Sequence, residues 1–115
     1  MATINVTQAG IRIGFTTGEK IAGLLRDIEV PLTHVRSVEL VPDGLGAVRG
    51  VRAPGLGLPG RKLGTWRGRA GKTLVDVRRD QPAVLIETPL SRFDRLLIGA
   101  DDAQRHVDQL NALLR

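Results

Sequence analysis

Three short apolar segments in the second half of the chain constrain its fold most strongly. Their sequences are KTLVDVR (72–78), AVLIET (83–88) and FDRLLIG (93–99), and turn-forming residues separate them. Segments of this length and spacing are typical of strands in a sandwich or barrel, whereas a parallel sheet needs longer crossover connections. We therefore expect antiparallel β structure at the core of one domain that spans residues 1–115.

The first part of the chain predicts a hairpin followed by a short helix. Apolar and polar residues alternate within residues 2–16, with turn chemistry in the middle, which is typical of two paired strands. In the next segment, residues 17–25, Ile21, Leu24 and Leu25 have the i, i+3, i+4 spacing of one helical face. We expect about two helical turns here.

The centre of the chain is rich in glycine and proline. Residues 42–71 hold 9 of the 14 glycines, so we expect short strands joined by bends, with LGTWRG as the clearest strand. The sequence GLGLPG (55–60) matches the dinucleotide pattern G-x-G-x-x-G. That motif needs a helix N-terminus after it to hold the pyrophosphate, and RKLGTWRG does not begin a helix. We interpret GLGLPG as a structural bend.

The last segment predicts an amphipathic helix. Four apolar residues repeat at i, i+4, i+7 and i+11 and form one stripe, namely Ala103, Val107, Leu110 and Leu114. We expect this helix to lie across an open end of the β structure and to close its core.

Composition excludes several classes of function. The 115 residues include no cysteine, which excludes disulfides and thiol catalysis, and contain no run of about 18 apolar residues that could cross a membrane. Neither His34 nor His106 belongs to a metal-binding pattern, and no nucleophile and base are paired. We expect no enzymatic activity, metal or cofactor. We expect a cytoplasmic location, with peripheral attachment to a membrane as an open alternative.

Positive charge is concentrated in the middle of the chain. Residues 49–79 contain nine basic side chains and one acidic one, a net charge of +8, while the rest of the chain carries −3. Such a segment favours an anionic partner if its side chains converge in space; simple solvation is the alternative. The candidate contacts with an anion or another partner are Arg49, Arg52, Arg61, Lys62, Trp66, Arg67 and Arg69.

Two residues of this segment have a second interpretation. Trp66 is a possible stacking platform, but in a chain with three aromatic residues we expect it in the core. Asp76 lies between Val75 and Val77 in a predicted strand, so we expect it to face away from the core, near Arg78 on the same face, and to form a same-face or cross-strand ion pair.

The order of these elements resembles the bacterial pleckstrin-homology-like (PH-like) domains. The sequences that carry the resemblance are GEKIAGLLRDIEVPLTHVRSVELV, RAPGLGLPG followed by GTW, AVLIETPL, and LLIGADDAQRHVDQL. The resemblance implies a mainly β fold, with a bent antiparallel sheet or barrel of about seven strands and a capping C-terminal helix, without cofactor or catalytic residues. Eukaryotic relatives that bind inositol phosphates carry a Lys/Arg cluster in the first hairpin, where this chain has Arg12 alone.

Two hypotheses about function follow. The first is a non-catalytic binding or assembly module that pairs with another protein or with a second copy through exposed strand edges, forming a homo-oligomer in the latter case. The second is a peripheral binder of an anionic membrane or acidic ligand through the glycine-rich basic segment 49–72. We do not expect nucleic-acid binding, because the sequence predicts neither several exposed aromatic residues nor a helix for the groove.

Overall fold

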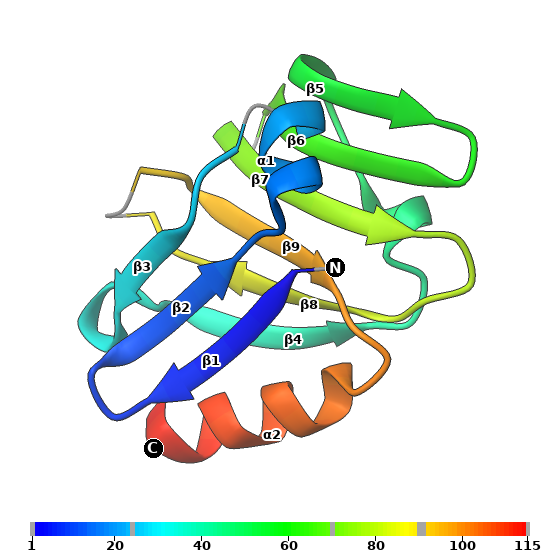
Figure 1. The fold of residues 1–115 in the computed structure, drawn as a ribbon. Helices are drawn as coiled ribbons and strands as arrows, with labels where there is room; N and C mark the ends of the chain where they lie inside the picture. Colours follow the sequence, from blue (N-terminus) through cyan, green and yellow to red (C-terminus); the bar gives the residue numbers. More distant parts are fainter. Residues whose placement is uncertain (1, 24, 70, 90–91, 115) are drawn as a thin grey trace.

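The computed structural model describes residues 2–23, 25–69, 71–89 and 92–114. In these residues the chain forms two β-sheets and two α-helices (Figure 1). The smaller sheet is antiparallel and has the strand order β1-β2-β3. Its strands are β1 (Thr3–Thr7), β2 (Gly10–Gly14) and β3 (Ile28–Pro31).

The larger sheet has six strands in the order β4-β8-β9-β7-β6-β5. They are β4 (Ser37–Val41), β5 (Val51–Leu58), β6 (Arg61–Gly68), β7 (Gly71–Arg78), β8 (Ala83–Glu87) and β9 (Arg95–Gly99). The helices are α1 (Thr17–Gly23) and α2 (Ala103–Leu114), with short 3-10 turns η1 (Leu32–His34) and η2 (Leu45–Ala47). In the described ranges, neither α-helix is long and apolar enough to span a membrane.

The predicted mainly β fold with a C-terminal helix is confirmed, and so are the hairpin in residues 2–16 and the three strands in residues 72–99. Two details differ. The described residues form nine strands rather than about seven, and β7 and β9 pair in parallel. The parallel pair arises because β8 does not pair with β7. Instead β9 lies between β8 and β7. It runs antiparallel to β8 and therefore parallel to β7.

The prediction of short strands in the glycine-rich centre is wrong, since β5 and β6 have eight residues each. The glycines allow close backbone contact within these strands instead of ending them. Gly55 has φ +144°, and a Cβ atom there would lie 2.4 Å from the carbonyl oxygen of Leu63. The register of the pair also shifts between Arg52 and Gly55, as at a β-bulge.

The main core lies between the two sheets and α2. Ile13 from the small sheet and Leu96 and Ile98 from the large sheet are fully buried in it. Helix α2 contacts β1, β4 and β8 and places Leu110 in the core, so it closes the core as predicted (Figure 1).

In α1, however, Ile21 is 70% exposed, because this short helix contacts β5 and β6 through another face. We call the side of the large sheet that contacts the main core its inner face.

The opposite, outer face of the large sheet carries a second apolar cluster, formed by Trp66, Val75, Val77, Ala83 and Leu97. Residues 42–50, which we call the cover segment, cross this face. The Gly44 N–H donates to the Gln81 carbonyl at 3.1 Å, and Leu45, Ala47 and Val48 pack against the cluster. The cover segment leaves part of the outer face open, and this opening is the candidate site.

Candidate functional site

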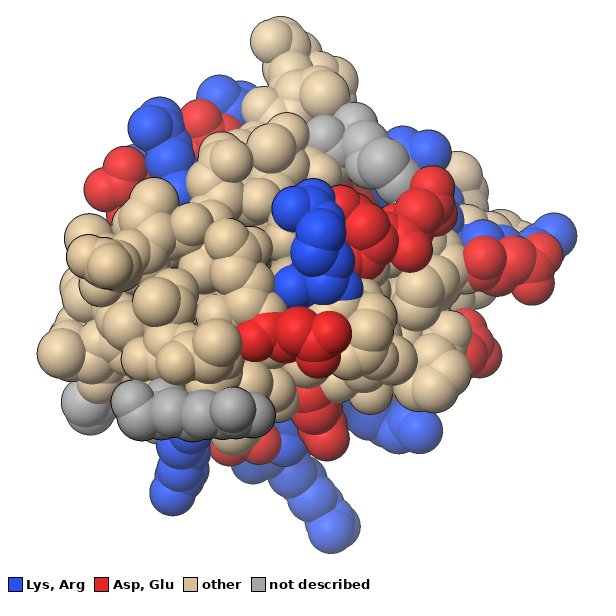
Figure 2. All heavy atoms as spheres, turned by 90° about the horizontal axis from the view of Figure 1, so that it is seen from below, with Lys and Arg blue, Asp and Glu red and all other residues tan. Residues whose placement is uncertain are grey.

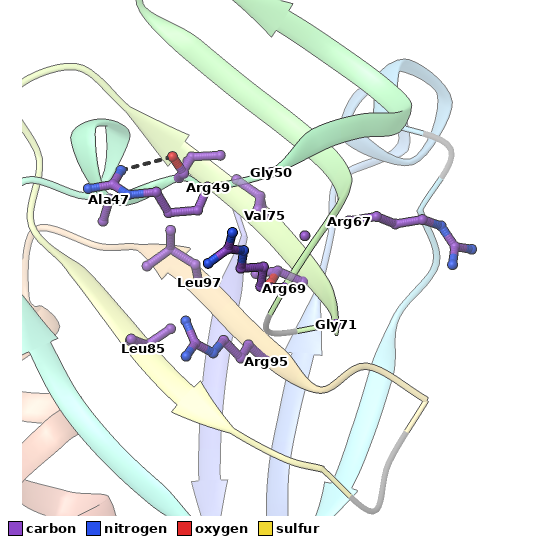
Figure 3. A pocket seen from close by; sticks show the side chains of 13 residues that line it. Ala47, Arg49, Gly50, Arg67, Arg69, Gly71, Val75, Leu85, Arg95 and Leu97 are labelled. Atoms are coloured by element: carbon purple, nitrogen blue, oxygen red, sulfur yellow. Dashed lines mark hydrogen bonds between the residues drawn. The ribbon is translucent and has the colours of Figure 1, made fainter.

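A pocket of about 500 Å³ lies between the cover segment and the outer face of the large sheet. Its floor is formed by Val75, Leu85 and Leu97 (Figure 3). These side chains share one face because Leu97 is opposite Leu85 in the β8–β9 pair and opposite Val75 in the β7–β9 pair. Val75 is 0% and Leu97 2% exposed. The floor is therefore apolar and fixed by strands at the centre of the sheet.

Gly50 allows the cover segment to approach β6 closely at one side of the pocket. Gly50, with φ +93°, ends the cover segment, and a Cβ atom there would lie 2.3 Å from the carbonyl oxygen of Arg67. Only glycine combines this backbone conformation with so close an approach. Because Gly50 lies against β6, the preceding residues Ala47 and Val48 form a wall of the pocket.

Four arginines also line the pocket, namely Arg49, Arg67, Arg69 and Arg95. Figure 3 shows the side chains of Arg69 and Arg95 extending over the floor beside Leu97 and Leu85, whereas Arg67 points away from it. The guanidinium of Arg49 donates to the carbonyl oxygens of Gly46 at 2.7 Å and Val48 at 3.0 Å. Arg49 therefore braces the cover segment, and Arg69 and Arg95 are the cations directed over the apolar floor.

Two carboxylates lie next to the pocket. Asp94 Oδ2 lies against Gly71 of the pocket lining and accepts from the Lys72 N–H at 2.8 Å. Arg95 Nη2 lies 4.0 Å from Glu87 Oε1, and both side chains are about one-third exposed, so solvent screens this pair strongly. Arg69 is exposed and has no ion pair within the described part of the chain. The pocket thus presents two guanidinium groups beside a floor of apolar side chains, which offer them no hydrogen-bond acceptor.

The structure separates the seven contacts predicted from the sequence. Arg49, Arg67 and Arg69 line the pocket, but Lys62 lines a different, more open hollow beside the cover segment. Trp66 is 5% exposed and belongs to the outer apolar cluster, so its ring is not a stacking platform. The side chain of Arg52 lies outside the described residues.

Arg61, the remaining predicted contact, turns inward instead. Sequence reasoning also missed Arg95, which follows Arg69 by 26 residues and belongs to another strand. Arg95 and Leu97 are two residues apart in one strand and therefore share a face, and this spacing was the available signal for a cation beside an apolar floor.

The face covered by α2 has a different charge pattern. Figure 2 shows acidic and basic side chains side by side on this face, next to a broad uncharged area. On α2 itself, Arg105 pairs with Asp102, and His106 Nε2 lies 3.2 Å from Asp102 Oδ1. This face therefore offers no concentrated attraction for an anion.

Arg61 holds together a buried charge cluster on the inner face. Its Nη2 atom lies 3.0 Å from Glu19 Oε2 and 2.9 Å from Asp76 Oδ1. Glu19 also closes a capping box at the start of α1, since its carboxylate accepts from the Thr16 N–H and its own N–H donates to the Thr16 hydroxyl. The cluster thus ties α1 to β6 and β7, and it removes Arg61 from the set of cations available to a ligand.

Asp76 does not face away from the core as predicted. It is 3% exposed and lies on the inner face with Leu74, opposite Leu63 of β6. The expected ion pair does form, across the strands, with Arg61 of β6. The alternation with Val75 and Val77 was interpreted correctly as placing Asp76 on the other face. The assignment of faces was wrong because both faces of β7 are buried, and the valines belong to the outer cluster.

The two carboxyl groups of the cluster have opposite pKa shifts. Burial raises the pKa of Asp76 to about 7, and the neighbouring Glu19 carboxyl adds to this effect against the attraction of Arg61. For Glu19, burial acts upward, but hydrogen bonds from Asp76 and the Thr16 N–H outweigh it and lower the pKa to about 2. The pair therefore holds its proton on Asp76, whose Oδ2 atom is buried without a hydrogen-bond partner among the described residues.

Comparisons with protein-family models, curated proteins and solved structures find no significant match to this chain. In the described residues, no group of three or more His, Asp or Glu side chains is arranged to hold a metal ion. The arginine-lined pocket and the Glu19–Arg61–Asp76 cluster are therefore interpreted from their own chemistry.

The raised pKa of Asp76 predicts that the free energy of unfolding falls as the pH rises from about 5 to about 8. The folded state binds the proton more tightly than the unfolded state, so this stabilisation is complete at low pH and is lost as the pH passes about 7. Each pKa unit corresponds to about 1.4 kcal/mol. Asp76→Asn should remove most of this fall in urea denaturation, because the amide keeps an acceptor for Arg61 without titrating.

Asp108→Asn is the matched control, since Asp108 is exposed on α2; it should keep the wild-type dependence on pH. An Asp76→Asn variant whose stability depends on pH as the wild type does would show that Asp76 does not hold this proton.

Proposed function

We propose that this chain is a non-catalytic binding module that takes an anionic ligand in the pocket lined by Arg69 and Arg95. The observation that carries the proposal is the position of these two guanidinium groups over an apolar floor (Figure 3). This is the second of the two functions expected from the sequence, now assigned to one pocket rather than to the whole segment 49–72.

The chemistry of arginine supports an anionic ligand. Guanidinium groups present planar N–H donors that match carboxylate, sulfate or phosphate oxygens, and such charge-assisted bonds are about twice as strong as neutral ones. Water does not screen charges as well beside an apolar surface as in bulk solvent. An anion bound between Arg69 and Arg95 would therefore interact with both cations, in competition with Glu87 for Arg95.

The size and lining of the pocket support a small ligand. Its volume of about 500 Å³ lies within the range of roughly 300–1,000 Å³ that is usual for small-molecule sites. Such sites combine a mostly apolar lining with a few polar groups that orient the ligand. Val75, Leu85 and Leu97 supply the first feature, and the two arginines supply the second.

Anilinonaphthalene sulfonate, a fluorescent anion, tests this proposal. We expect it to bind the wild-type protein and to receive excitation energy from Trp66, the only tryptophan, which packs beside the floor in the same outer cluster. Replacing both cations (Arg69→Gln with Arg95→Gln) should weaken binding by about tenfold or more, equivalent to about 1.4 kcal/mol. High salt should weaken wild-type binding in the same direction.

The control carries Arg26→Gln and Arg36→Gln, which remove the same charge from exposed positions outside the pocket. Its affinity for the dye should stay within about twofold of the wild type, because screening limits the effect of distant surface charges. Equal losses in the two double variants, or no loss in either, would contradict binding at this pocket. Thermal unfolding of each variant checks that its fold is intact.

The second candidate function is self-assembly through β5. This strand lies at one edge of the large sheet and pairs with β6 alone, so one row of its backbone groups is available to another strand. Leu58 at its end is 51% exposed. A second copy of the chain could extend the sheet at this edge.

Size-exclusion chromatography with light scattering at low and high salt tests this candidate. Pairing through backbone and apolar contacts predicts a discrete oligomer whose size does not depend on salt. A monomer at every concentration and salt level would remove self-assembly from consideration.

A further inference from the structure

The floor of the pocket specifies more about the ligand than its charge. A bare inorganic anion would contact the arginines but would leave the half-buried apolar side chains of Leu85, Ala47 and Val48 partly in contact with water. It would also lose hydration beside an apolar surface without any compensating contact. A ligand that uses the whole pocket must combine an anionic group with an apolar part.

The positions of the cations divide the pocket into two regions. The guanidinium groups of Arg69 and Arg95 lie beside Leu97 and Leu85, and Ala47 lies beyond these side chains (Figure 3). An anionic head at the arginines therefore places the rest of the ligand between Leu97 and the wall formed by Ala47 and Val48. Aliphatic side chains line this region on both sides, and the Arg49 side chain crosses beside it with its guanidinium bonded to carbonyl oxygens of the cover segment (Figure 3).

We propose that the pocket binds a free single-chain amphiphile, with a carboxylate or similar anionic head held by Arg69 and Arg95 and an acyl chain packed between Leu97 and the cover segment. This inference rests on the proposed function and names its ligand class. Charge complementarity selects the anionic head, and the aliphatic lining selects the chain.

An acyl chain suits this pocket better than a polar anion because half-buried apolar side chains, Leu85, Ala47 and Val48, line it around the buried cluster. Val75 and Leu97 already pack with Trp66, and a chain above them would extend the same apolar packing. Each methylene group removed from water contributes favourably to binding. Affinity should therefore rise with chain length until the chain fills the space below Ala47 and Val48.

A series of sodium alkanoates from acetate to decanoate tests the proposal, used below the concentrations at which they form micelles. We expect each added methylene to raise affinity about fourfold, measured by Trp66 fluorescence and by titration calorimetry. Decanol, which has the chain without the charge, should bind at least about tenfold more weakly than decanoate. Affinity that does not depend on chain length, or equal affinity for decanol and decanoate, would overturn the inference.

A variant that fills the chain region separates the two parts of the pocket. Ala47→Phe places a bulky side chain in the wall while leaving Arg69 and Arg95 unchanged. It should remove most of the dependence on chain length. Ala22→Phe, at an exposed position of α1, is the matched control and should keep the wild-type dependence. If Ala47→Phe disrupts folding, the wild-type alkanoate series still decides the question.

Failure of this inference differs from failure of the proposed function. If the dye requires Arg69 and Arg95 but alkanoate affinity does not depend on chain length, the pocket binds anions without an acyl chain. If neither dye nor decanoate depends on these arginines, both proposals are wrong. Binding to vesicles of phosphatidylglycerol without binding of free decanoate would replace the free amphiphile with a membrane surface.

Discussion

Apolar side chains on both faces of β7 and β9 are the constraint on which the rest of the structure depends. Leu74, Leu96 and Ile98 face the main core, while Val75 and Leu97 face the other way, and all five are buried. A sheet of this kind needs a cover on each side, because exposed apolar surface of this extent is unfavourable in water. The small sheet and α2 cover the inner face, and residues 42–50 cover the outer one.

The unequal size of these two covers explains where the pocket lies. A sheet and a helix fill the inner side completely, whereas a nine-residue segment with one short 3-10 turn crosses the outer side. The remaining part of the outer face borders the β6–β7 hairpin, where Arg69 lies, and the start of β9, where Arg95 lies. The pocket therefore lies where the cover segment ends and where these two arginines border the outer face.

Sequence periodicity predicted the strands and helices with strong patterns. It did not predict which face of a strand is buried or which strands are neighbours. The hairpin in residues 2–16, the three strands in residues 72–99 and α2 follow from local alternation or helical spacing. Asp76 was assigned to the wrong face because alternation shows which residues share a face of a strand but not which face is buried. Arg69 was a predicted contact, but Arg95 required knowledge that β9 lies next to β7. No local pattern encodes that parallel neighbour, and the resemblance to PH-like domains remains a prediction.

Nuclear magnetic resonance of the methyl groups during a titration with decanoate tests the central claim most directly. Binding in this pocket should change the methyl signals of Val75, Leu85 and Leu97, while those of Ile13 and Leu96 in the main core stay unchanged. Signals that change in the small sheet instead, or none that change at decanoate concentrations below micelle formation, would contradict the assignment of this pocket as the binding site.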